Sequence, residues 1–429
     1  MGKGLGSSEI LFQAMRVCFM NEADPQLFET NETVSFEPSR ANGLRRLEQF
    51  VARTGRHYAR TRNYDFGPKK RTNVSVLSPW LRHRLVTEED VLARVLKTHS
   101  PSASEKFVQE VFWRTYFKGW LEQRPSVWTH YQTELMRALE SLDCHADLQC
   151  KYQEAVSGRT GIDCFDHWVN ELLETGYLHN HSRMWFASIW IFTLRLPWQL
   201  GADFFLRHLL DGDPASNTLS WRWVAGLHTK GKTYLAKRAN IIKYTEGRFD
   251  PKGLANYAEP LAESLDHKRI QITHQTSLMQ EPYLLLLTED DLGPTSWANP
   301  NLAGTIGLLA THGRSPEPVA PKVLEFASGA INSVLPDGEF SAQSVDDWFA
   351  PLLGAARQLK VNTIVTAYVP IGPSRSRLDR AESNLSAAGI TLKRVSRPYD
   401  SVAWPHAKAG FFGLKKQLTG ILRQLNLAP

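Results

Sequence analysis

Residues 177–226 read YLHNHSRMWFASIWIFTLRLPWQLGADFFLRHLLDGDPASNTLSWRWVAG, and this stretch decides how the rest of the chain is interpreted. It holds five tryptophans, and Asp211 and Asp213 lie on either side of a glycine at a Gly/Pro turn. An ion pair between Arg183 and Asp211 would stay buried only if further hydrogen bonds satisfied both charges. Such a pair is common beside a bound polar ring system and uncommon in a plain core, so we expect these residues to line a pocket.

The overall composition is that of a globular protein. The chain has 429 residues, of which 42% are hydrophobic and 22% charged, and it contains no long apolar run. These values argue against a membrane span. No signal peptide is visible, which favours a cytoplasmic location. The four cysteines form no CxxC pair and no zinc-like spacing, so we expect reduced structural thiols and no metal site.

Positive charge is concentrated in two stretches. Residues 40–71 hold ten Lys and Arg against two acidic residues, and residues 230–252 hold seven against two. Dense local positive charge favours a polyanion as partner, and nucleic acid is the usual one. The alternative is a pair of solvated helix faces.

The first half of the chain has helical periodicity. Apolar residues recur at helical spacing from Gly43 onward, and TEEDVLARVL begins with Thr87 followed by Asp90, a variant of the capping box. Ten of the 13 tryptophans lie between positions 80 and 223. We therefore expect residues 40–260 to form one all-helical domain, preceded by an irregular segment over 1–39.

The second half has a different pattern. Short apolar runs begin near residue 281, and residues 361–398 read as strand, helix, strand, with the helix ending at Gly389. This pattern predicts an open parallel, Rossmann-like α/β domain over 280–429, joined by a linker over 261–279. The predicted fold class is thus a helical domain followed by an α/β domain, in which no GxGxxG or Walker A sequence occurs.

One helix carries a mixed set of side chains. Glu110, Trp113 and Arg114 are spaced i, i+3, i+4 and so project from one face. A carboxylate, an indole and a guanidinium line a pocket better than they fill a core. Exposed charges beside a chance tryptophan are the alternative.

Four blocks of the sequence resemble the FAD-binding helical domain of the photolyase and cryptochrome family. ETGYLHNHSRMWFAS and LLDGDPASNTLSWRWVAG are close to that family's wording, TGWMHNRxRMxxASF and LIDGDxAxNxxxWQW. NVSVLSPWL resembles its TSxLSPYL phosphate segment, and QEVFWRTYF resembles its ELxWREF helix. The blocks follow the family's order and cover about residues 40–255.

The resemblance implies a bound FAD. The serine-rich turn would hold the pyrophosphate through amides and hydroxyls, the arginines would surround the flavin, and Asn217 would face flavin N5. Asp211 and Asp213 would contact Arg183, the ribose or the ring edge. The implied FAD-binding residues are Tyr58, Ser75, Val76, Leu77, Ser78, Phe107, Arg114, Asn180, Arg183, Asp211, Asp213 and Asn217.

The resemblance also implies a substrate wall. Glu110, Trp113, Asn180, Met184 and Trp223 match positions that contact the flipped lesion in photolyases acting on cyclobutane pyrimidine dimers. The two tryptophans would clamp the bases, and a protonated Glu110 would hydrogen-bond the pyrimidine carbonyls. Relatives that split six-four photoproducts carry a proton-donating His where this chain has Met184.

Trp221 and Trp198 match the first two members of the family's electron relay. The third position has no tryptophan: an ungapped reading lands near His145, with Tyr152 or Trp128 as conceivable substitutes.

The chain departs from the family pattern at several points. His181 stands where the family usually has Arg, and Thr115 where it has Glu. The family's α/β antenna domain usually precedes the helical domain, so the α/β domain here is interpreted as a permuted antenna domain, with an unrelated domain as the alternative. A second, antenna chromophore is a further expectation, of unknown identity.

The predicted function is that of a deoxyribodipyrimidine photolyase-like lyase: a blue-light, FAD-dependent DNA repair enzyme whose partner is DNA with UV-damaged pyrimidines. The alternative is a cryptochrome-like blue-light photoreceptor without repair activity. A third interpretation is a nucleic-acid binder that has lost its flavin.

Overall fold

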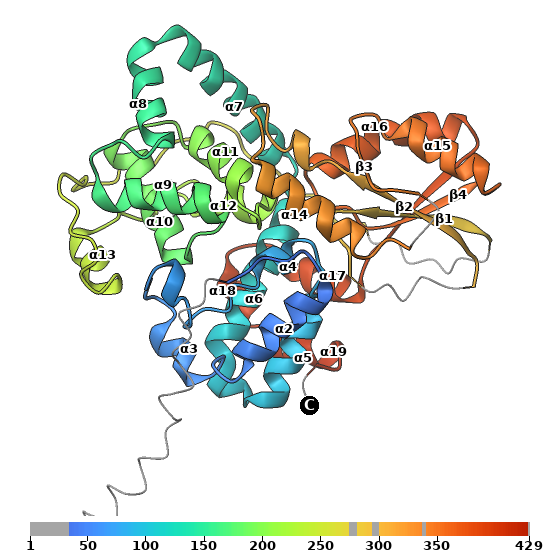
Figure 1. Ribbon diagram of the computed structural model, residues 1–429, viewed down its shortest axis with the longest axis horizontal. Coiled ribbons are helices and arrows are strands. Elements are labelled where there is room, and N and C mark those ends of the chain that lie inside the picture. Colours follow the sequence, from blue (N-terminus) through green and yellow to red (C-terminus); the bar gives the residue numbers. More distant parts are fainter. Residues whose placement is uncertain (1–33, 274–280, 294–299, 337–339, 428–429) are drawn as a thin grey trace, which may run out of the picture.

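The computed structural model describes residues 34–273, 281–293, 300–336 and 340–427. Helices from the first part of the chain lie on one side of the molecule, and a parallel sheet with its helices lies on the other (Figure 1). Most of the N-terminal segment expected to be irregular, and part of the expected linker, fall outside the described residues. Across the described ranges, no helix is both long and apolar enough to cross a bilayer.

The helical part contains twelve α-helices among the described residues. They are α2 (Arg40–Val51), α3 (Arg56–Thr61), α4 (Ser78–Arg82), α5 (Glu88–Thr98), α6 (Pro101–Glu122), α7 (Ser126–Cys144), α8 (Ala146–Val156), α9 (Asp163–Thr175), α10 (Asn180–Ser188), α11 (Trp198–His208), α12 (Pro214–Val224) and α13 (Arg238–Tyr244).

Local sequence signals explain where several helices begin. The capping box predicted at α5 is confirmed, because Thr87 and Asp90 bond each other's backbone amides. Asp213 caps α12 by accepting from the amide of Ser216 at 2.7 Å, and Pro214 occupies the first turn, where it costs no hydrogen bond. The start of α12 is therefore well defined, and so is the position of the Asp211–Asp213 loop before it.

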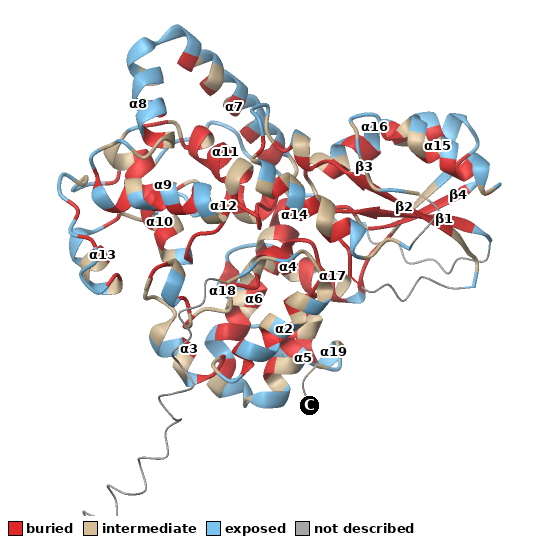
Figure 2. Cartoon of the chain, viewed as in Figure 1, coloured by how far each residue is buried: buried red, intermediate tan, exposed pale blue. Residues whose placement is uncertain are grey.

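Tryptophans fill the interior of the helical part. Trp168, Trp185, Trp190 and Trp221 are fully buried, and the first two stack at a ring-centroid distance of 5.6 Å. The buried residues lie along the inward faces of the helices, whereas much of α7 and α8 is exposed (Figure 2). Trp223 is only half-buried, which leaves it available to line a surface.

The sheet is parallel throughout and has the strand order β3-β2-β1-β4-β5. Its strands are β1 (Tyr283–Thr288), β2 (Leu302–Leu309), β3 (Gln343–Ser344), β4 (Thr363–Ala367) and β5 (Thr391–Val395). The helices that accompany them are α14 (Pro321–Asn332), α15 (Phe349–Gln358) and α16 (Pro373–Ala387). The predicted strand, helix, strand unit corresponds to β4, α16 and β5, and Gly389 follows α16 with a φ of 80°.

Both faces of the central strand are covered, which explains its unbroken apolar sequence. Leu284 and Leu286 of β1 pack into a cluster with α15 and α16, and Leu285 and Leu287 pack into the main core that continues into the helical part. The sheet and the helices therefore share one core.

The chain returns to the helical part after β5. Three short helices, α17 (Pro398–Ala403), α18 (Phe411–Lys415) and α19 (Leu418–Gln424), follow the last strand, and all three carry buried residues. Gly119 of α6 allows the closest approach, because a Cβ there would lie 2.9 Å from the backbone of Trp404. Tyr116 of α6 also donates a hydrogen bond to the carbonyl of Ala409 at 2.8 Å. The segment from α17 to α18 thus packs on α6 of the helical part.

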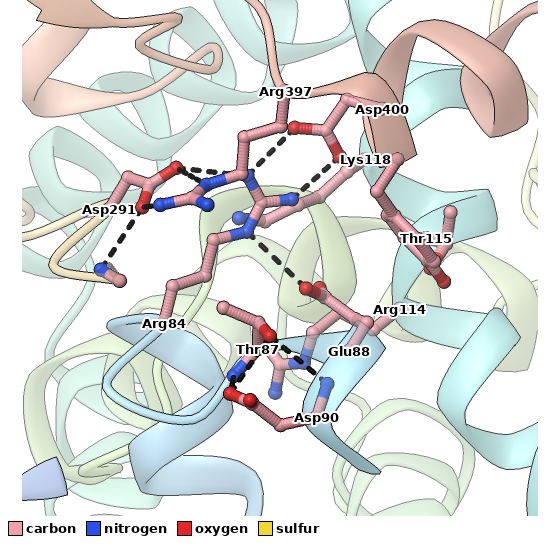
Figure 3. Close-up of polar contacts among 12 residues, drawn as sticks. Arg84, Thr87, Glu88, Asp90, Arg114, Thr115, Lys118, Asp291, Arg397 and Asp400 are labelled. Carbon is pink, nitrogen blue, oxygen red and sulfur yellow. Dashed lines mark hydrogen bonds and ion pairs between the residues drawn. The ribbon is translucent and has the colours of Figure 1, made fainter. Parts of the chain in front are cut away.

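Buried ion pairs close the carboxyl ends of β1 and β5 (Figure 3). Asp291, just after β1, accepts from Arg397, just after β5, at 2.6 and 2.7 Å. Arg84 donates to Asp291 at 3.1 Å and to Asp400 at 2.6 and 2.7 Å. Burial opposes the ionisation of Asp291, but the two guanidinium groups outweigh it and lower the pKa of this carboxyl to about 2.

A second contact joins this strand end to the helical part. Arg82 pairs with Asp290 at 2.8 Å and donates to the carbonyl of Gly212 at 2.9 Å. The strand end at which α/β sheets usually bind ligands is therefore filled by side chains of this chain.

Candidate functional site

A cavity of about 640 Å³ opens between α3, α4, α6, α10 and α12. Its volume is typical of a cofactor or substrate site. The structure brings all the predicted FAD-binding and lesion-contacting residues to its wall. They are Tyr58, Ser75, Val76, Leu77, Ser78, Phe107, Glu110, Trp113, Arg114, Asn180, Arg183, Met184, Asp211, Asp213, Asn217 and Trp223, together with Trp221 of the predicted relay. Trp198 lies outside this lining.

One wall is the turn that leads into α4. Val76 has a φ of 56°, a left-handed conformation that β-branched residues rarely adopt. The turn is held from outside by Arg46, which donates to the carbonyl of Ser75 at 2.7 Å. Strain of this kind persists only where the surrounding structure enforces it, and it marks the turn as a functional candidate.

The predicted ion pair between Arg183 and Asp211 is confirmed, with a nitrogen to oxygen distance of 3.0 Å. The guanidinium also donates to the carbonyl of Leu178 at 3.0 Å and lies over the ring of Tyr177. Burial would raise the pKa of Asp211, but Arg183 and Arg114 lower it overall. The loop thus presents an ionised carboxylate to the cavity.

Asp213 has other cationic partners than Asp211. Its carboxylate lies 3.8 Å from Lys118 and 3.9 Å from Arg114, besides capping α12. These cations, with Lys118 the larger influence, outweigh burial and lower the pKa of Asp213. The carboxylate of Asp213 therefore holds the cationic side chains of Lys118 and Arg114 beside the cavity.

Several buried polar atoms on the cavity wall have no hydrogen-bond partner among the described residues. They are Oδ1 of Asp211, Nη1 of Arg114 and Oγ of Ser216. Buried polar atoms are nearly always paired, so these three point to a polar ligand. Asn217 is oriented by its own donation to the carbonyl of Ala202 at 2.8 Å, which leaves the amide oxygen as the acceptor for a ligand. The residues present fit a polar ring system such as FAD.

The opposite wall carries the two half-buried tryptophans. Trp113 stacks on Phe411 of α18 with a centroid distance of 3.8 Å and an interplanar angle of 10°. Trp223 stacks on Tyr234 at 5.5 Å. Each indole is thus held from behind by another ring while it lines the cavity. Sequence reasoning did not find Phe411, which lies about 300 residues from Trp113 and in no motif.

Glu110 also has a partner that the sequence did not identify. It forms an ion pair with Arg62, and both side chains are about a quarter exposed. The only sequence signal for Arg62 is its place in the first basic stretch. His181, at the position where the resemblance leads one to expect Arg, also lines the cavity. Burial, with Arg62 as a smaller cause in the same direction, lowers the pKa of His181 to about 4, so this side chain is neutral at physiological pH.

Part of the chain is similar in sequence to known proteins. Residues 107–283 match the family model described as the FAD binding domain of DNA photolyase. A deoxyribodipyrimidine photo-lyase of Alkalihalophilus pseudofirmus is 27% identical over 241 residues, which cover 56% of this chain and 48% of that protein. A cryptochrome DASH of Ostreococcus tauri is 29% identical over 244 residues, which cover 55% of this chain and 42% of that protein. The chain spans about half the length of the curated relatives it matches.

Among solved structures, a cryptochrome of Synechocystis sp. is similar at 23% identity and a TM-score of 0.43, covering 51% of this chain and 46% of that one. The region matched by the family model contains α6, α10 and α12, which supply much of the cavity wall. Residues 107–283 thus carry an FAD-binding domain of the photolyase/cryptochrome superfamily.

Proposed function

We propose that the protein is a light-driven DNA repair enzyme that splits cyclobutane pyrimidine dimers. The observation that carries the proposal is that one cavity is lined by both predicted sets of residues, those for FAD and those for the lesion. Curated relatives that bear the name deoxyribodipyrimidine photo-lyase support it further. The proposed substrate is DNA that contains such a dimer.

The FAD end of the cavity is formed by the α4 turn and the Asp211–Asp213 loop. We propose that the turn holds the pyrophosphate and that Arg183, Arg114 and Asn217 contact the flavin. When bound, FAD supplies light absorption and one-electron chemistry. The residues around it exclude water and fix its orientation, because α4, α6, α10 and α12 share one core.

The lesion end is formed by Trp113, Trp223, Met184 and Asn180, with Glu110 beside them. The dimer would leave the duplex and enter between the indoles, as photolyases are base-flipping enzymes. Because Arg62 pairs with Glu110, we propose that the Arg62 guanidinium donates to a pyrimidine carbonyl and that Glu110 positions it. Bound reduced FAD would supply one electron to the dimer, the two cyclobutane bonds of the dimer would break, and the electron would return to the cofactor.

The two basic stretches support a DNA-binding face beside the cavity. They meet where the amide of Asp65 donates to the carbonyl of Tyr244 at 2.8 Å. The first stretch supplies Arg62 to the cavity wall, and the second supplies Tyr234 behind Trp223. Their exposed cations are Arg45, Arg56, Arg60, Lys69, Lys70, Lys230, Lys232, Lys237, Arg238, Lys243, Arg248 and Lys252. Contacts between such side chains and phosphates would make DNA binding weaken steeply with salt.

The test is a repair assay. FAD-loaded, reduced protein is illuminated with an oligonucleotide that contains a cyclobutane dimer, and the return of thymine ultraviolet absorbance is followed. We expect light-dependent recovery, loss of that recovery in Trp113→Ala, and retention in Phe412→Ala, whose ring is 73% exposed and outside the cavity lining.

Absence of recovery in protein that has bound FAD would overturn the repair proposal. That result would favour a blue-light photoreceptor, for which the stacking of α18 on Trp113 is the supporting contact, since it couples the cavity wall to the C-terminal segment.

A further inference from the structure

One carboxylate on the cavity wall belongs to neither predicted set of residues. Glu88, in the first turn of α5, lines the cavity and is only 2% exposed. Val91 follows it at i+3 and lines the cavity from the same face of the helix. Glu88 lies outside residues 107–283, which match the family model, and outside the four blocks that carry the resemblance. Its place at the cavity is therefore a feature of this chain that no motif predicts.

The carboxylate of Glu88 is buried without a hydrogen bond. Among the described residues it has one ion-pair partner, Arg84, with 3.4 Å between Oε2 of Glu88 and Nε of Arg84. That contact includes no hydrogen bond, because Nε of Arg84 has no hydrogen-bond partner in the described part of the chain. Arg84 instead donates to Asp400 at 2.6 and 2.7 Å and to Asp291 at 3.1 Å. Buried polar groups are nearly always hydrogen-bonded, so Glu88 points to a donor that a ligand supplies.

The surrounding cations do not fully compensate the charge of Glu88. Next to it, buried carboxylates outnumber guanidinium groups by three to two (Figure 3). They are Glu88, Asp291 and Asp400 against Arg84 and Arg397. A further cation, Lys118, forms its ion pair with Asp213 at 3.8 Å. One negative charge remains in excess, and Glu88 is the member of this set that lines the cavity.

The negative charge limits which part of FAD can meet Glu88. A carboxylate repels the pyrophosphate, which the proposed function places at the α4 turn. The proposed flavin contacts come from α6, α10 and α12. Around Glu88 the other cavity residues of α4, α5 and α6 include the apolar side chains of Leu81, Val91 and Val111. An apolar slot with one convergent acceptor suits the adenosine half, which has a flat purine, an amino group and two ribose hydroxyls.

We propose that Glu88 binds the adenosine half of FAD by accepting a hydrogen bond from the adenine amino group or the ribose hydroxyls. The inference rests on FAD binding in the proposed function and is independent of dimer splitting. Without FAD, the chain carries the cost of a buried carboxylate that lacks a donor, and bound FAD removes that cost. Replacing Glu88 therefore weakens cofactor binding without removing a hydrogen bond from the FAD-free fold.

The first test combines FAD titration with urea unfolding of the FAD-free protein. Glu88→Ala should weaken FAD binding by roughly 10- to 100-fold. Glu88→Gln should recover part of that affinity, because an amide oxygen still accepts. Neither variant should lower the urea midpoint of the FAD-free protein, since Arg84 keeps Asp400. Glu89→Ala is the matched control and should keep the FAD affinity of the parent, because Glu89 is half-buried on the same turn but outside the cavity lining.

A lower urea midpoint in Glu88→Gln with unchanged FAD affinity would assign Glu88 to the support of Arg84 and overturn the proposal. Equal losses of FAD affinity in Glu88→Ala and Glu89→Ala would also overturn it.

The second test is a crystal structure of the FAD-loaded protein. We expect an oxygen of Glu88 within about 3 Å of the adenine amino nitrogen or a ribose hydroxyl. A carboxylate that meets only the ribityl chain, or no part of FAD, would contradict the assignment. Parent protein that binds FAD in this way but does not split dimers would count against the proposed function and not against the role of Glu88.

Discussion

The cavity in the helical part and the strand ends of the sheet are built from the same residue types, yet they differ in what the buried charges face. At the strand ends, Asp291 accepts hydrogen bonds from Arg84 and Arg397, and the buried nitrogens of Arg82 and Arg84 that lack a hydrogen bond lie in ion pairs with Asp290 and Glu88. In the cavity, Asp211 and Arg114 line an open volume, and each keeps a buried atom without a hydrogen-bond partner among the described residues. Buried charge by itself therefore does not identify a ligand site. Unsatisfied polar atoms that face an open volume do.

The carboxyl ends of the strands hold ion pairs between described residues. In open parallel sheets the crevice at the carboxyl ends of the strands binds ligands. Here Asp290, Asp291 and Arg397 fill that place and connect it to α4 and α17. The same ion pairs fix the sheet against the domain that contains the cavity.

The largest predicted effect comes from a substitution in the strand-end network, which is the set of buried ion pairs among Arg84, Asp291, Arg397 and Asp400. Asp291→Ala removes the buried carboxylate that accepts from both Arg397 and Arg84, although Arg84 keeps Asp400, and should lower the free energy of unfolding by about 3–5 kcal/mol. Urea denaturation measures the change. Glu48→Ala is the matched control, because it removes an exposed partner of Arg94 and should cost less than about 1 kcal/mol. An equal loss of unfolding free energy in the two variants would show that the buried ion pairs at the strand ends stabilise the fold no more than an exposed pair does.

A smaller effect follows from acidification. The folded-state pKa of Asp291 lies near 2, below its ordinary value of 3.8, so the folded protein binds this proton less readily than the unfolded chain. The stabilisation is present above about pH 4 and lost as the pH falls toward about 2, and a shift of this size corresponds to about 2 kcal/mol. Unfolding measured across this range should be steeper in pH for the parent protein than for Asp291→Asn. Identical slopes would contradict the assignment.

The smallest predicted effect concerns Phe411, the ring that stacks on Trp113 of the cavity wall. Phe411→Leu keeps an apolar side chain under Trp113 but removes the stacked ring, which should cost about 1 kcal/mol and alter the near-ultraviolet circular dichroism of the indole. Phe412→Leu, at a neighbouring exposed position, should change stability by less than about 0.5 kcal/mol. An unchanged spectrum in Phe411→Leu would mean that α18 does not orient Trp113.

Features that depend on neighbouring residues in sequence were predictable. The capping box at Thr87, the unit formed by β4, α16 and β5, and the pair between Arg183 and Asp211 each follow from periodicity, turn chemistry or residue spacing within a short segment. The positions of the cavity residues followed from the resemblance, whose blocks carry them.

Features that depend on distant packing were not predictable. Phe411 behind Trp113, and Asp400 beside Arg84, come from segments about 300 residues apart in the chain, and nothing in either local sequence specifies the partner. Tyr131 lies in an ordinary amphipathic helix, and its relation to Trp198 appears only once α7 packs on α11. Contacts between residues far apart in the chain hold the side chains of the cavity wall in place, and local sequence patterns do not predict such contacts.

The central claim is that the cavity is a binding site and that the strand-end network is structural. The most direct test is the dissociation constant of FAD, measured by titration for Arg183→Ala and Asp291→Asn under conditions in which both are folded. Losing a charge-assisted contact worth about 1.5–3 kcal/mol should weaken FAD binding of Arg183→Ala by roughly 10- to 100-fold, whereas Asp291→Asn should bind FAD as the parent protein does. Weaker binding in Asp291→Asn with unchanged binding in Arg183→Ala would contradict the account.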